Sequence, residues 1–156
     1  MGSRRPSAAV RQRIFVARCH ERGLAVTHQR LAIYGALAST DEHPTAETLY
    51  RTIHETYPTI SLATIYKTLE TLEREGLISK FTFFQEAARY DANQERHHHR
   101  VCVRCGRVED FYDASLDRLP MSDHRRLGFK VLNHQVQVHG LCRRCRRPTT
   151  PARKDA

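Results

Sequence analysis

Apolar residues recur at helical spacing in four segments of the first half of the chain, separated by polar turns. Each of the last three segments follows a residue with a hydroxyl side chain, and such a residue before an apolar period is a typical N-cap. The pattern predicts a helix over residues 8–22, with Val10, Ile14, Ala17 and Arg18 on its inner stripe. It predicts three further helices that begin after Thr27, Thr45 and Ser61.

The fourth of these helices, over residues 62–75, separates its side chains into two faces. One face collects the apolar residues Leu62, Ile65, Leu69 and Leu72. The opposite face is small, polar and basic, as a helix that enters the major groove of DNA must be. Its candidates for contact with DNA are Thr64, Tyr66 and Lys67. For Tyr66, packing against the following hairpin is the alternative interpretation.

Two short strands, residues 77–84 and 88–91, are predicted after this helix and form a hairpin. Helices followed by a hairpin are the layout of a winged helix-turn-helix domain, in which the last helix before the hairpin reads DNA. A generic small helical bundle with a polar outer face is the alternative. We expect the winged-helix domain to span residues 1–91, with a polar hinge at residues 92–95.

The second half of the chain changes from helical to strand-like patterns. It predicts strands at 99–103 and 108–112, a helix at 115–127 and a strand at 129–139, in the order β-β-α-β. The fold class is therefore α+β, with a small C-terminal αβ domain over residues 96–148 and a disordered tail at 149–156. The core of such a domain is too thin to be stable alone, so we expect zinc and dimerisation to support it.

Composition adds a basic surplus and argues against a membrane or secretory location. The 156 residues carry a formal charge of +9, and no segment is apolar enough for a membrane span or a signal peptide. We therefore expect a cytoplasmic protein. Residues 1–22 hold six Arg against one Glu, and residues 93–156 hold fourteen Lys or Arg against seven acids. This distribution suits an acidic partner such as DNA, and solvated basic termini are the alternative.

Four of the five cysteines occur in two identical motifs, Cys102-x-x-Cys105 and Cys142-x-x-Cys145. The two-residue spacer lets a pair of thiolates bind one tetrahedral ion, and two pairs complete a closed, structural zinc shell. The cytoplasm keeps thiols reduced, so metal is favoured over disulfides. A redox switch that uses the same thiols is the competing hypothesis. Cys19 has no partner motif and is expected to be a buried apolar residue.

A histidine run, His97–His99, directly precedes the first cysteine pair. Because side chains alternate along a strand, His97 and His99 would face one side and could chelate one ion, while His98 would face the other. Further ligands must come from elsewhere. The candidates are His43, Asp91 and Asp110, and the residue pattern alone leaves the choice among them open.

Six segments together resemble the ferric uptake regulator superfamily of bacterial metal-dependent repressors. They are THQR at 27–30, HPTA at 43–46, SLATIYKTL at 61–69, RYD at 89–91, HHHRVCVRCG at 97–106 and the terminal Cys142-x-x-Cys145. They occur in order over most of the chain. The resemblance implies a homodimer with an N-terminal winged helix for a palindromic DNA operator and a C-terminal dimerisation domain, bridged by a regulatory metal.

Carried over position by position, the resemblance is greatest to the peroxide-sensing branch, often called PerR. It implies a regulatory Fe²⁺ or Mn²⁺ held by His43, Asp91, His97, His99 and Asp110, beside the structural Zn²⁺. Iron-sensing relatives more often have Glu at the two Asp positions. Some members hold a further metal, for which His98, Asp117 and His134 correspond here. Arg96 stands where a His is usual, so only a weak extra metal site is expected.

The resemblance implies a repressor that leaves DNA when the reaction of H₂O₂ with bound Fe²⁺ oxidises a ligating histidine, His97 or His43. The Mn²⁺ form would be insensitive to H₂O₂. An iron-responsive repressor with little peroxide sensitivity is the alternative within the family. A metal-dependent hydrolase would use similar ligands, but the chain has no His-Glu-x-x-His motif, so no enzyme is expected. A zinc-stabilised interaction module without DNA binding is the third class.

Overall fold

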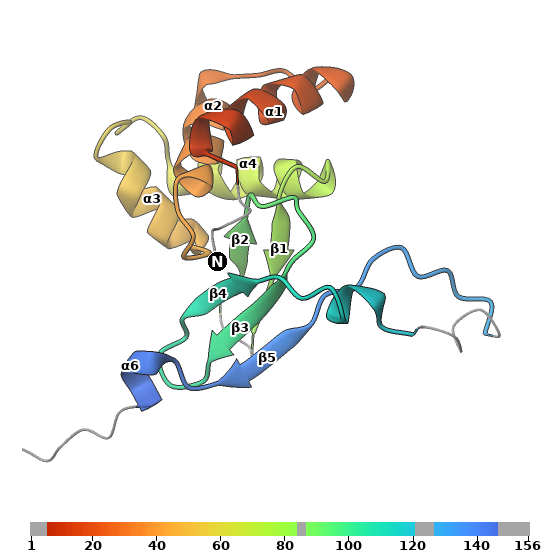
Figure 1. Ribbon diagram of the computed structural model, residues 1–156. Coiled ribbons are helices and arrows are strands. Elements are labelled where there is room, and N and C mark those ends of the chain that lie inside the picture. The colour runs from red at the N-terminus through yellow and green to blue at the C-terminus, as the bar shows by residue number, and fades with distance from the viewer. Residues whose placement is uncertain (1–5, 84–86, 121–126, 147–156) are drawn as a thin grey trace, which may run out of the picture. The chain divides into compact units, whose positions relative to one another are not determined.

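The computed structural model describes residues 6–83, 87–120 and 127–146 and divides the chain into two compact units, Met1–Glu95 and Arg96–Ala156 (Figure 1). Part of the predicted hairpin turn, residues 121–126 of the predicted helix and the predicted tail lie outside the described residues. No helix in the described part of the chain has the length and apolar character that crossing a membrane requires.

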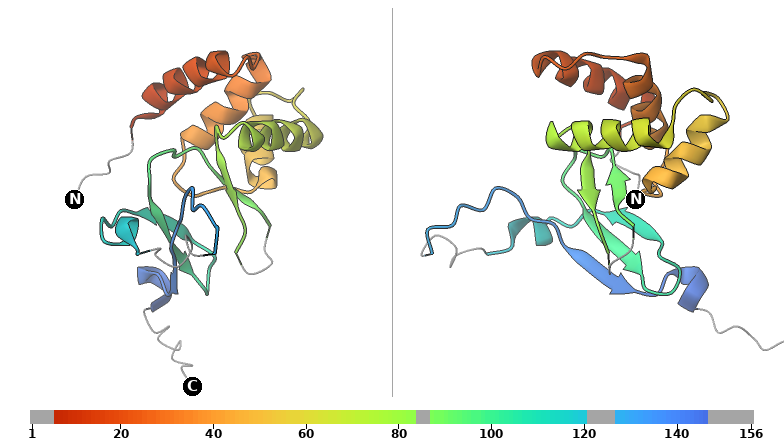
Figure 2. Two further views of the ribbon diagram at one scale, coloured as in Figure 1. Left: turned by 90° about the vertical axis from the view of Figure 1, so that its right-hand side faces the viewer. Right: turned by 180° about the vertical axis from the view of Figure 1, so that it is seen from behind.

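The first unit contains four helices and a two-stranded antiparallel hairpin (Figures 1 and 2). The helices are α1 Ala8–Glu21, α2 His28–Ala38, α3 Ala46–His54 and α4 Leu62–Arg74, and the strands are β1 Ser79–Phe81 and β2 Arg89–Asp91. The strands are shorter than predicted, with Lys80 paired to Tyr90 at their centre. This element order is that of a winged helix, with α4 as the last helix before the wing.

The predicted caps of three helices are confirmed. The side-chain oxygens of Thr27, Thr45 and Ser61 accept hydrogen bonds from backbone N–H groups of the first turns of α2, α3 and α4. Helices α1 and α4 end where Gly23 and Gly76 adopt φ values of 64° and 62°, the left-handed conformation that glycine adopts without a steric penalty. Local chemistry therefore sets the boundaries of α4 at both ends.

The predicted inner stripe of α1 is wrong. Phe15 and Cys19, one helical turn apart, are the buried residues of this helix, and Ile14 is 47% exposed. The ring of Phe15 stacks on Tyr34 of α2 with 3.9 Å between ring centroids. The large aromatic side chain sets the face of the helix that is buried, and Ile14 lies outside it. Cys19 is fully buried, as predicted, and this burial raises the pKa of its thiol.

The core of the first unit is formed where α2, α3 and α4 pack together. Helix α4 contributes Ile65, Leu69 and Leu72, each fully buried, as predicted from its apolar period. Leu62, which was also expected on this face, is only half-buried. The side opposite the core carries the exposed residues Ala63, Tyr66 and Lys67. Helix α4 is thus anchored by one face and leaves the other open.

Replacement of Ser61 by alanine should lower the free energy of unfolding of the first unit by about 1 kcal/mol, the usual cost of losing an N-cap. The Ser61 hydroxyl accepts the N–H of Thr64 at 3.1 Å. Urea unfolding of the metal-loaded chain measures the change. Thr71→Ala is the matched control, because it removes a hydroxyl from the interior of α4, where alanine is the better helix former. An equal loss in both variants would contradict the capping role.

The second unit is a three-stranded sheet with the order β4-β3-β5. Its elements are β3 His98–Cys102, β4 Val108–Phe111, the 3₁₀ turn Leu116–Arg118, β5 Gln137–Gly140 and the short helix α6 Arg143–Arg146. Strand β3 pairs antiparallel with β4 and parallel with β5, and in that register Cys102 lies opposite Gly140. The ends of β3 and β5 that carry the cysteine motifs therefore meet.

Two predictions for this unit are wrong. In the described residues 115–120, the helix expected at 115–127 forms only a 3₁₀ turn and leaves helical geometry at Leu119, whose ψ is 128°. Leu119 precedes Pro120, and the proline ring disfavours helical backbone at the residue before it. The strand expected at 129–139 is reduced to β5, and residues 129–136 are irregular. In that segment Phe129 and Leu132 are 61% and 84% exposed, so the described part of the chain offers these two side chains no apolar surface to pack against.

Candidate metal centre and DNA-facing helix

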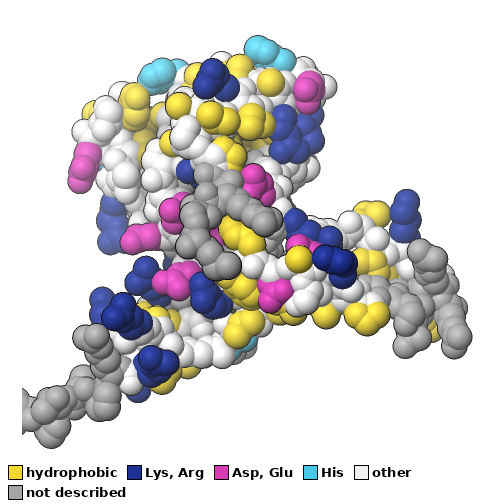
Figure 3. All heavy atoms as spheres, in the orientation of Figure 1, with side chains coloured by type: hydrophobic (Ala, Val, Ile, Leu, Met, Phe, Trp, Pro, Cys, Tyr) yellow, Lys and Arg dark blue, Asp and Glu magenta, His cyan; other side chains and the backbone are white. Residues whose placement is uncertain are grey.

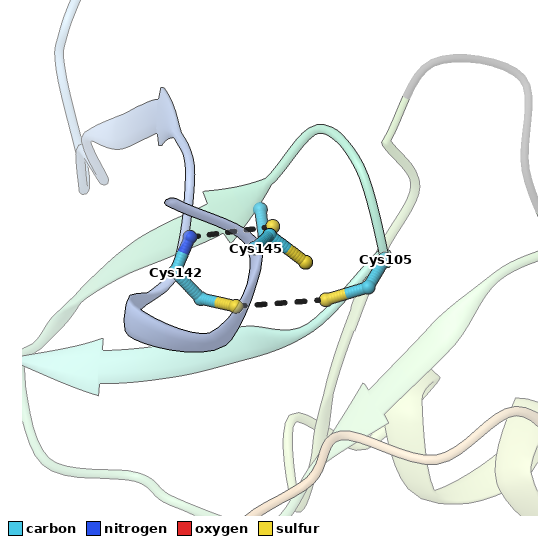
Figure 4. Close-up of side chains that lie close together, drawn as sticks. Cys105, Cys142 and Cys145 are labelled. Carbon is cyan, nitrogen blue, oxygen red and sulfur yellow. Dashed lines mark hydrogen bonds between the residues drawn. The ribbon is translucent and has the colours of Figure 1, made fainter. Parts of the chain in front are cut away.

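The four cysteines of the two Cys-x-x-Cys motifs come together at one end of the sheet. Cys102 ends β3 and Cys105 follows it in a tight turn, whereas Cys142 and Cys145 follow β5. Figure 4 shows the sulfur atoms of Cys105, Cys142 and Cys145 directed toward a common centre. All four sulfur atoms lie within 4.8 Å of one another. The structure thus brings together residues that are up to 43 positions apart in the sequence.

The spacing of these sulfur atoms fits zinc. Cys105 Sγ and Cys142 Sγ are 3.8 Å apart, too far for a disulfide bond, which is about 2 Å long. A tetrahedral shell with Zn–S bonds of about 2.3 Å places its sulfur atoms about 3.8 Å apart. Four thiolates leave no open coordination position. The donor set and its spacing therefore define a structural zinc site, and all five cysteines of the chain are free thiols.

Backbone hydrogen bonds prepare part of this site for metal. The N–H of Cys142 donates to Cys102 Sγ at 3.3 Å, and this bond is the main cause that lowers the pKa of Cys102 to about 6. Burial and the neighbouring sulfur atoms raise the pKa of Cys145 to about 12. Four thiolates at such short range repel one another unless a cation lies among them. The zinc ion would supply that charge.

In the first unit, His43 and Asp91 lie side by side. His43 occupies the turn before α3, and its Nε2 atom is 3.5 Å from Asp91 Oδ2 at the end of the wing strand β2. The backbone of His43 has φ 51°, an uncommon value for a residue other than glycine, and Arg89 donates to its carbonyl oxygen at 3.2 Å. The other Asp91 oxygen accepts the N–H of Asn93 at 2.7 Å. The wing thus holds an imidazole and a carboxylate together.

In the second unit, His97, His99 and Asp110 converge. The Nε2 atoms of His97 and His99 are 3.1 Å apart. Asp110, which pairs with His99 across β3 and β4, places Oδ1 3.7 Å from His97 Nε2 and 3.5 Å from His99 Nε2. Two imidazole nitrogens and a carboxylate oxygen that face one point are a typical partial ligand set for a divalent transition metal.

The three residues of the expected weak extra site lie around Arg96. Asp117 Oδ1 is 3.3 Å from His98 Nε2 and 3.6 Å from Arg96 Nε, and Arg96 Nη2 is 3.0 Å from His134 Nδ1. The guanidinium therefore lies among the three side chains.

The residues predicted to contact DNA lie along the open face of α4. Tyr66 is 45% exposed and Lys67 is exposed, while the hydroxyl of Thr64 is 2.9 Å from that of Ser61. The hydroxyl of Tyr66 donates to the carboxylate of Glu47 on α3. This bond is the main cause that lowers the pKa of Glu47 and raises the pKa of Tyr66. Helix α3 thus holds the tip of an exposed side chain on α4.

Sequence analysis missed the contacts made by Glu47, Arg89 and Arg96. Glu47 and Tyr66 are 19 residues apart on different helices, so no local period links them. Arg96 drew notice only because it stands where family members usually have a histidine. A basic residue next to the histidine run was the available signal, because a long cationic side chain beside possible metal ligands can compete for the same acidic partners.

Comparisons with known proteins agree with this architecture. The model of the Ferric uptake regulator family matches residues 21–139. The peroxide-responsive repressor PerR of Staphylococcus epidermidis is 32% identical over 131 residues, which are 84% of this chain and 87% of that protein. The peroxide operon regulator of Bacillus subtilis is 33% identical over 125 residues, 80% of this chain and 86% of that protein. The crystal structure of the Campylobacter jejuni peroxide stress regulator superposes with a TM-score of 0.67 at 34% identity, over 85% of this chain and 98% of that one.

A winged helix followed by a small sheet unit with a four-cysteine site and clustered histidine and aspartate ligands defines the class of metal-responsive transcription regulators. The family match covers most of the chain, and the relatives named above are similar over more than four fifths of their own lengths. The chain belongs to the ferric uptake regulator family.

Proposed function

We propose that this chain is a cytoplasmic transcriptional repressor that binds a palindromic operator in double-stranded DNA as a homodimer and senses peroxide through a regulatory metal. The observation that carries the proposal is the convergence of His97, His99 and Asp110 in one unit and the pairing of His43 with Asp91 in the other. The names of the similar peroxide regulators support peroxide, rather than iron supply, as the signal. In this proposal the chain is a regulator and not an enzyme.

The two ligand sets would bind a single Fe²⁺ or Mn²⁺, while Zn²⁺ stays in the four-cysteine site. Mixed imidazole and carboxylate donors suit these ions, and thiolates suit zinc. Since His43 and Asp91 belong to the winged-helix domain, residues 1–91, and the other three ligands to residues 96–148, one ion would join the two across the hinge at 92–95. Metal binding would thereby favour one arrangement of the domains, the one competent to bind DNA.

His43, Asp91, His97, His99 and Asp110 would hold the ion, and Fe²⁺, unlike Mn²⁺, would supply a local oxidant from H₂O₂. The target of the oxidant would be a ligating imidazole. The rings of His97 and His99 lie next to each other, with centroids 4.8 Å apart. An oxygen added to His97 or His43 removes a nitrogen donor from the ligand set. The metal is then lost, and the DNA-competent arrangement with it.

Helix α4 would read the operator through Thr64, Tyr66 and Lys67. Tyr66 can meet thymine methyl groups with its ring edge, while Lys67 can reach a base edge or a phosphate. The hydrogen bond from Tyr66 to Glu47 holds the ring before DNA arrives, which lowers the ordering cost of binding.

The exposed apolar side chains of the second unit support the homodimer. Figure 3 shows hydrophobic side chains open along the segment near residues 127–136, where Leu127 and Leu132 are 80% and 84% exposed. Several large apolar side chains exposed close together in the sequence are typical of a protein interface. A two-fold axis would pair this surface with its copy.

Replacement of Leu132 by aspartate should weaken the dimer by about 3 kcal/mol or more, on the order of 100-fold, because both copies of the buried side chain change at a two-fold interface. Sedimentation equilibrium across a concentration series measures the dissociation constant. Ile14→Asp changes another exposed apolar residue, in the first unit, and should leave the dimer intact. Equal dissociation constants for Leu132→Asp and the unchanged chain would place the interface elsewhere.

Selection from a random double-stranded DNA library tests the proposal. With Mn²⁺, the zinc-loaded chain should enrich one palindromic sequence, and with a chelator that removes only the regulatory metal it should enrich none. Enrichment that does not depend on metal would refute the regulatory role of the histidine and aspartate ligands. Failure to enrich any sequence would favour the interaction module without DNA binding.

A further inference from the structure

The side chain of Arg96 lies at the centre of a cluster that the proposed function does not use. Arg96 is the first residue of the second unit, and its guanidinium reaches two segments far along the chain. Its Nη2 atom is 3.0 Å from His134 Nδ1, and its Nε atom is 3.6 Å from Asp117 Oδ1. We propose that the Arg96 guanidinium is the permanent cation of the site formed by His98, Asp117 and His134, which therefore binds no metal ion.

The hydrogen bonds of His134 fix the position of its ring proton. A guanidinium carries only donors, so Nδ1 of His134 must accept from Arg96. The ring proton is then on Nε2, which donates to the carbonyl oxygen of Leu116 at 2.8 Å. Both ring nitrogens of His134 are therefore engaged, and its lone pair faces the guanidinium.

The same reasoning applies to His98, which is fully buried. The backbone N–H of Val136 is 3.2 Å from its Nδ1 atom, so Nδ1 accepts. The proton is then on Nε2, which lies 3.3 Å from Asp117 Oδ1 without a directed hydrogen bond. The carboxylate of Asp117 thus lies between a ring N–H and a guanidinium.

This arrangement is incompatible with a divalent ion at the same place. To bind a metal through Nε2, His98 would have to carry its ring proton on Nδ1, where it would meet a second donor, the N–H of Val136. His134 could bind a metal only through Nδ1, and the guanidinium of Arg96 occupies that position. The carboxylate of Asp117 already has its positive partner. The structure therefore argues against the weak extra metal site that the family resemblance implied.

The arginine clasp, defined as Arg96, His98, Asp117 and His134, joins three segments of the second unit. It ties β3 to the 3₁₀ turn and to the irregular segment that precedes β5. His98 lies between His97 and His99 in the sequence, so the clasp fixes the strand that presents both of them. Arg96 is thus a positioning residue for these ligands, a role that rests on the proposed function, whereas the absence of metal from the clasp does not.

The proton positions can be measured in the zinc-loaded chain without any substitution. Long-range ¹H–¹⁵N spectra of the histidine rings should show His98 and His134 as Nε2–H tautomers, and both rings should keep this tautomer when Zn²⁺ is added in excess. A proton on Nδ1 of either ring, or loss of the Nε2 proton from both rings when Zn²⁺ is added, would overturn the proposal.

A gain-of-site experiment gives the second test. The Arg96→His chain should retain one equivalent of Zn²⁺ more than the unchanged chain after desalting, because an imidazole replaces the guanidinium and leaves the cation position to metal. Zinc should raise its midpoint of thermal unfolding, and Arg96→Met should be destabilised whether zinc is present or not. If Arg96 had only a structural role, zinc would not raise the midpoint of thermal unfolding of Arg96→His.

The control for this experiment is the double variant Arg96→His with His134→Ala, which should lose the extra equivalent. If the unchanged chain itself retains the additional zinc and His134→Ala removes it, the clasp is a metal site and the proposal is wrong. Neither measurement involves DNA or peroxide, so its failure is separate from any failure of the proposed repressor function.

Discussion

Replacement of Cys142 by serine is expected to abolish zinc binding and to unfold the sheet of the second unit. Strand β5 is short and exposed, and the four-cysteine site ties its end to β3. Structural zinc sites in small peptides contribute about 10–16 kcal/mol of apparent binding free energy at pH 7, and this free energy is coupled to folding. A loss of even part of it exceeds what a sheet this small gains from its own core. Elemental analysis and amide spectra measure the two effects.

Cys19→Ala is the control for this prediction, because Cys19 is buried in the first unit away from the zinc ligands. It should keep its full zinc content, and its free energy of unfolding should fall only by the cost of the small cavity that the substitution leaves. The helices of the first unit should also persist in Cys142→Ser, because their buried core, from Phe15 to Ala92, lies within the first unit. A folded second unit in metal-free Cys142→Ser would contradict the structural role of zinc.

Replacement of His97 by alanine is expected to eliminate metal-dependent operator binding. His97 contributes a nitrogen 3.1 Å from that of His99 and 3.7 Å from the carboxylate of Asp110. Changing residues that only support metal ligands costs about 10–100-fold in metal affinity, and loss of a ligand should cost at least that. Titration of the zinc-loaded variant with Mn²⁺, followed by fluorescence anisotropy of labelled operator, measures both affinities.

Asp91→Ala tests whether the two ligand sets hold one ion, because Asp91 belongs to the first unit and His97 to the second. The two variants should lose Mn²⁺ affinity to a similar degree. The exposed His20 on α1 offers a matched control, and His20→Ala should bind metal and operator as the unchanged chain does. If Asp91→Ala kept its Mn²⁺ affinity, the two sets would not share an ion.

The elements that sequence analysis predicted well are those whose boundaries depend on neighbouring residues. Thr27, Thr45 and Ser61 cap their helices through bonds to backbone groups three residues later, so the signal lies within a few positions. The cysteine motifs are equally local, since the two-residue spacer already fixes how a pair of thiolates can turn. In both cases the chemistry of a short segment determines its structure.

The errors occurred where packing or a single residue overrides a pattern. Along α1 two apolar stripes compete, and the stacking of Phe15 on Tyr34 selects between them. Pro120 interrupts a segment whose other residues favour a helix. Residues 129–136 alternate like a strand, but the described chain offers no surface to cover their apolar side chains. A segment whose apolar side chains pack against another molecule cannot be told from a strand of the chain's own sheet by its sequence pattern.

The candidate site was predictable as a set of residue types and unpredictable as a set of contacts. The alternation of His97 and His99 follows from strand geometry, and the structure places their rings together. The positions of protons in the arginine clasp depend on Val136 and Leu116, which approach the rings only in the folded unit. Hydrogen bonds between distant segments leave no period in the sequence.

Exposure of the iron and manganese forms to H₂O₂ tests whether this chain senses peroxide. The zinc-loaded chain is prepared without oxygen, given Fe²⁺ or Mn²⁺, and assayed for operator binding before and after a brief stoichiometric pulse of H₂O₂, with peptide masses determined afterwards. We expect that only the iron form loses operator binding, with one oxygen atom added at His43, His97 or His99. Unchanged binding of both forms would contradict peroxide sensing and would favour a repressor that responds to iron supply.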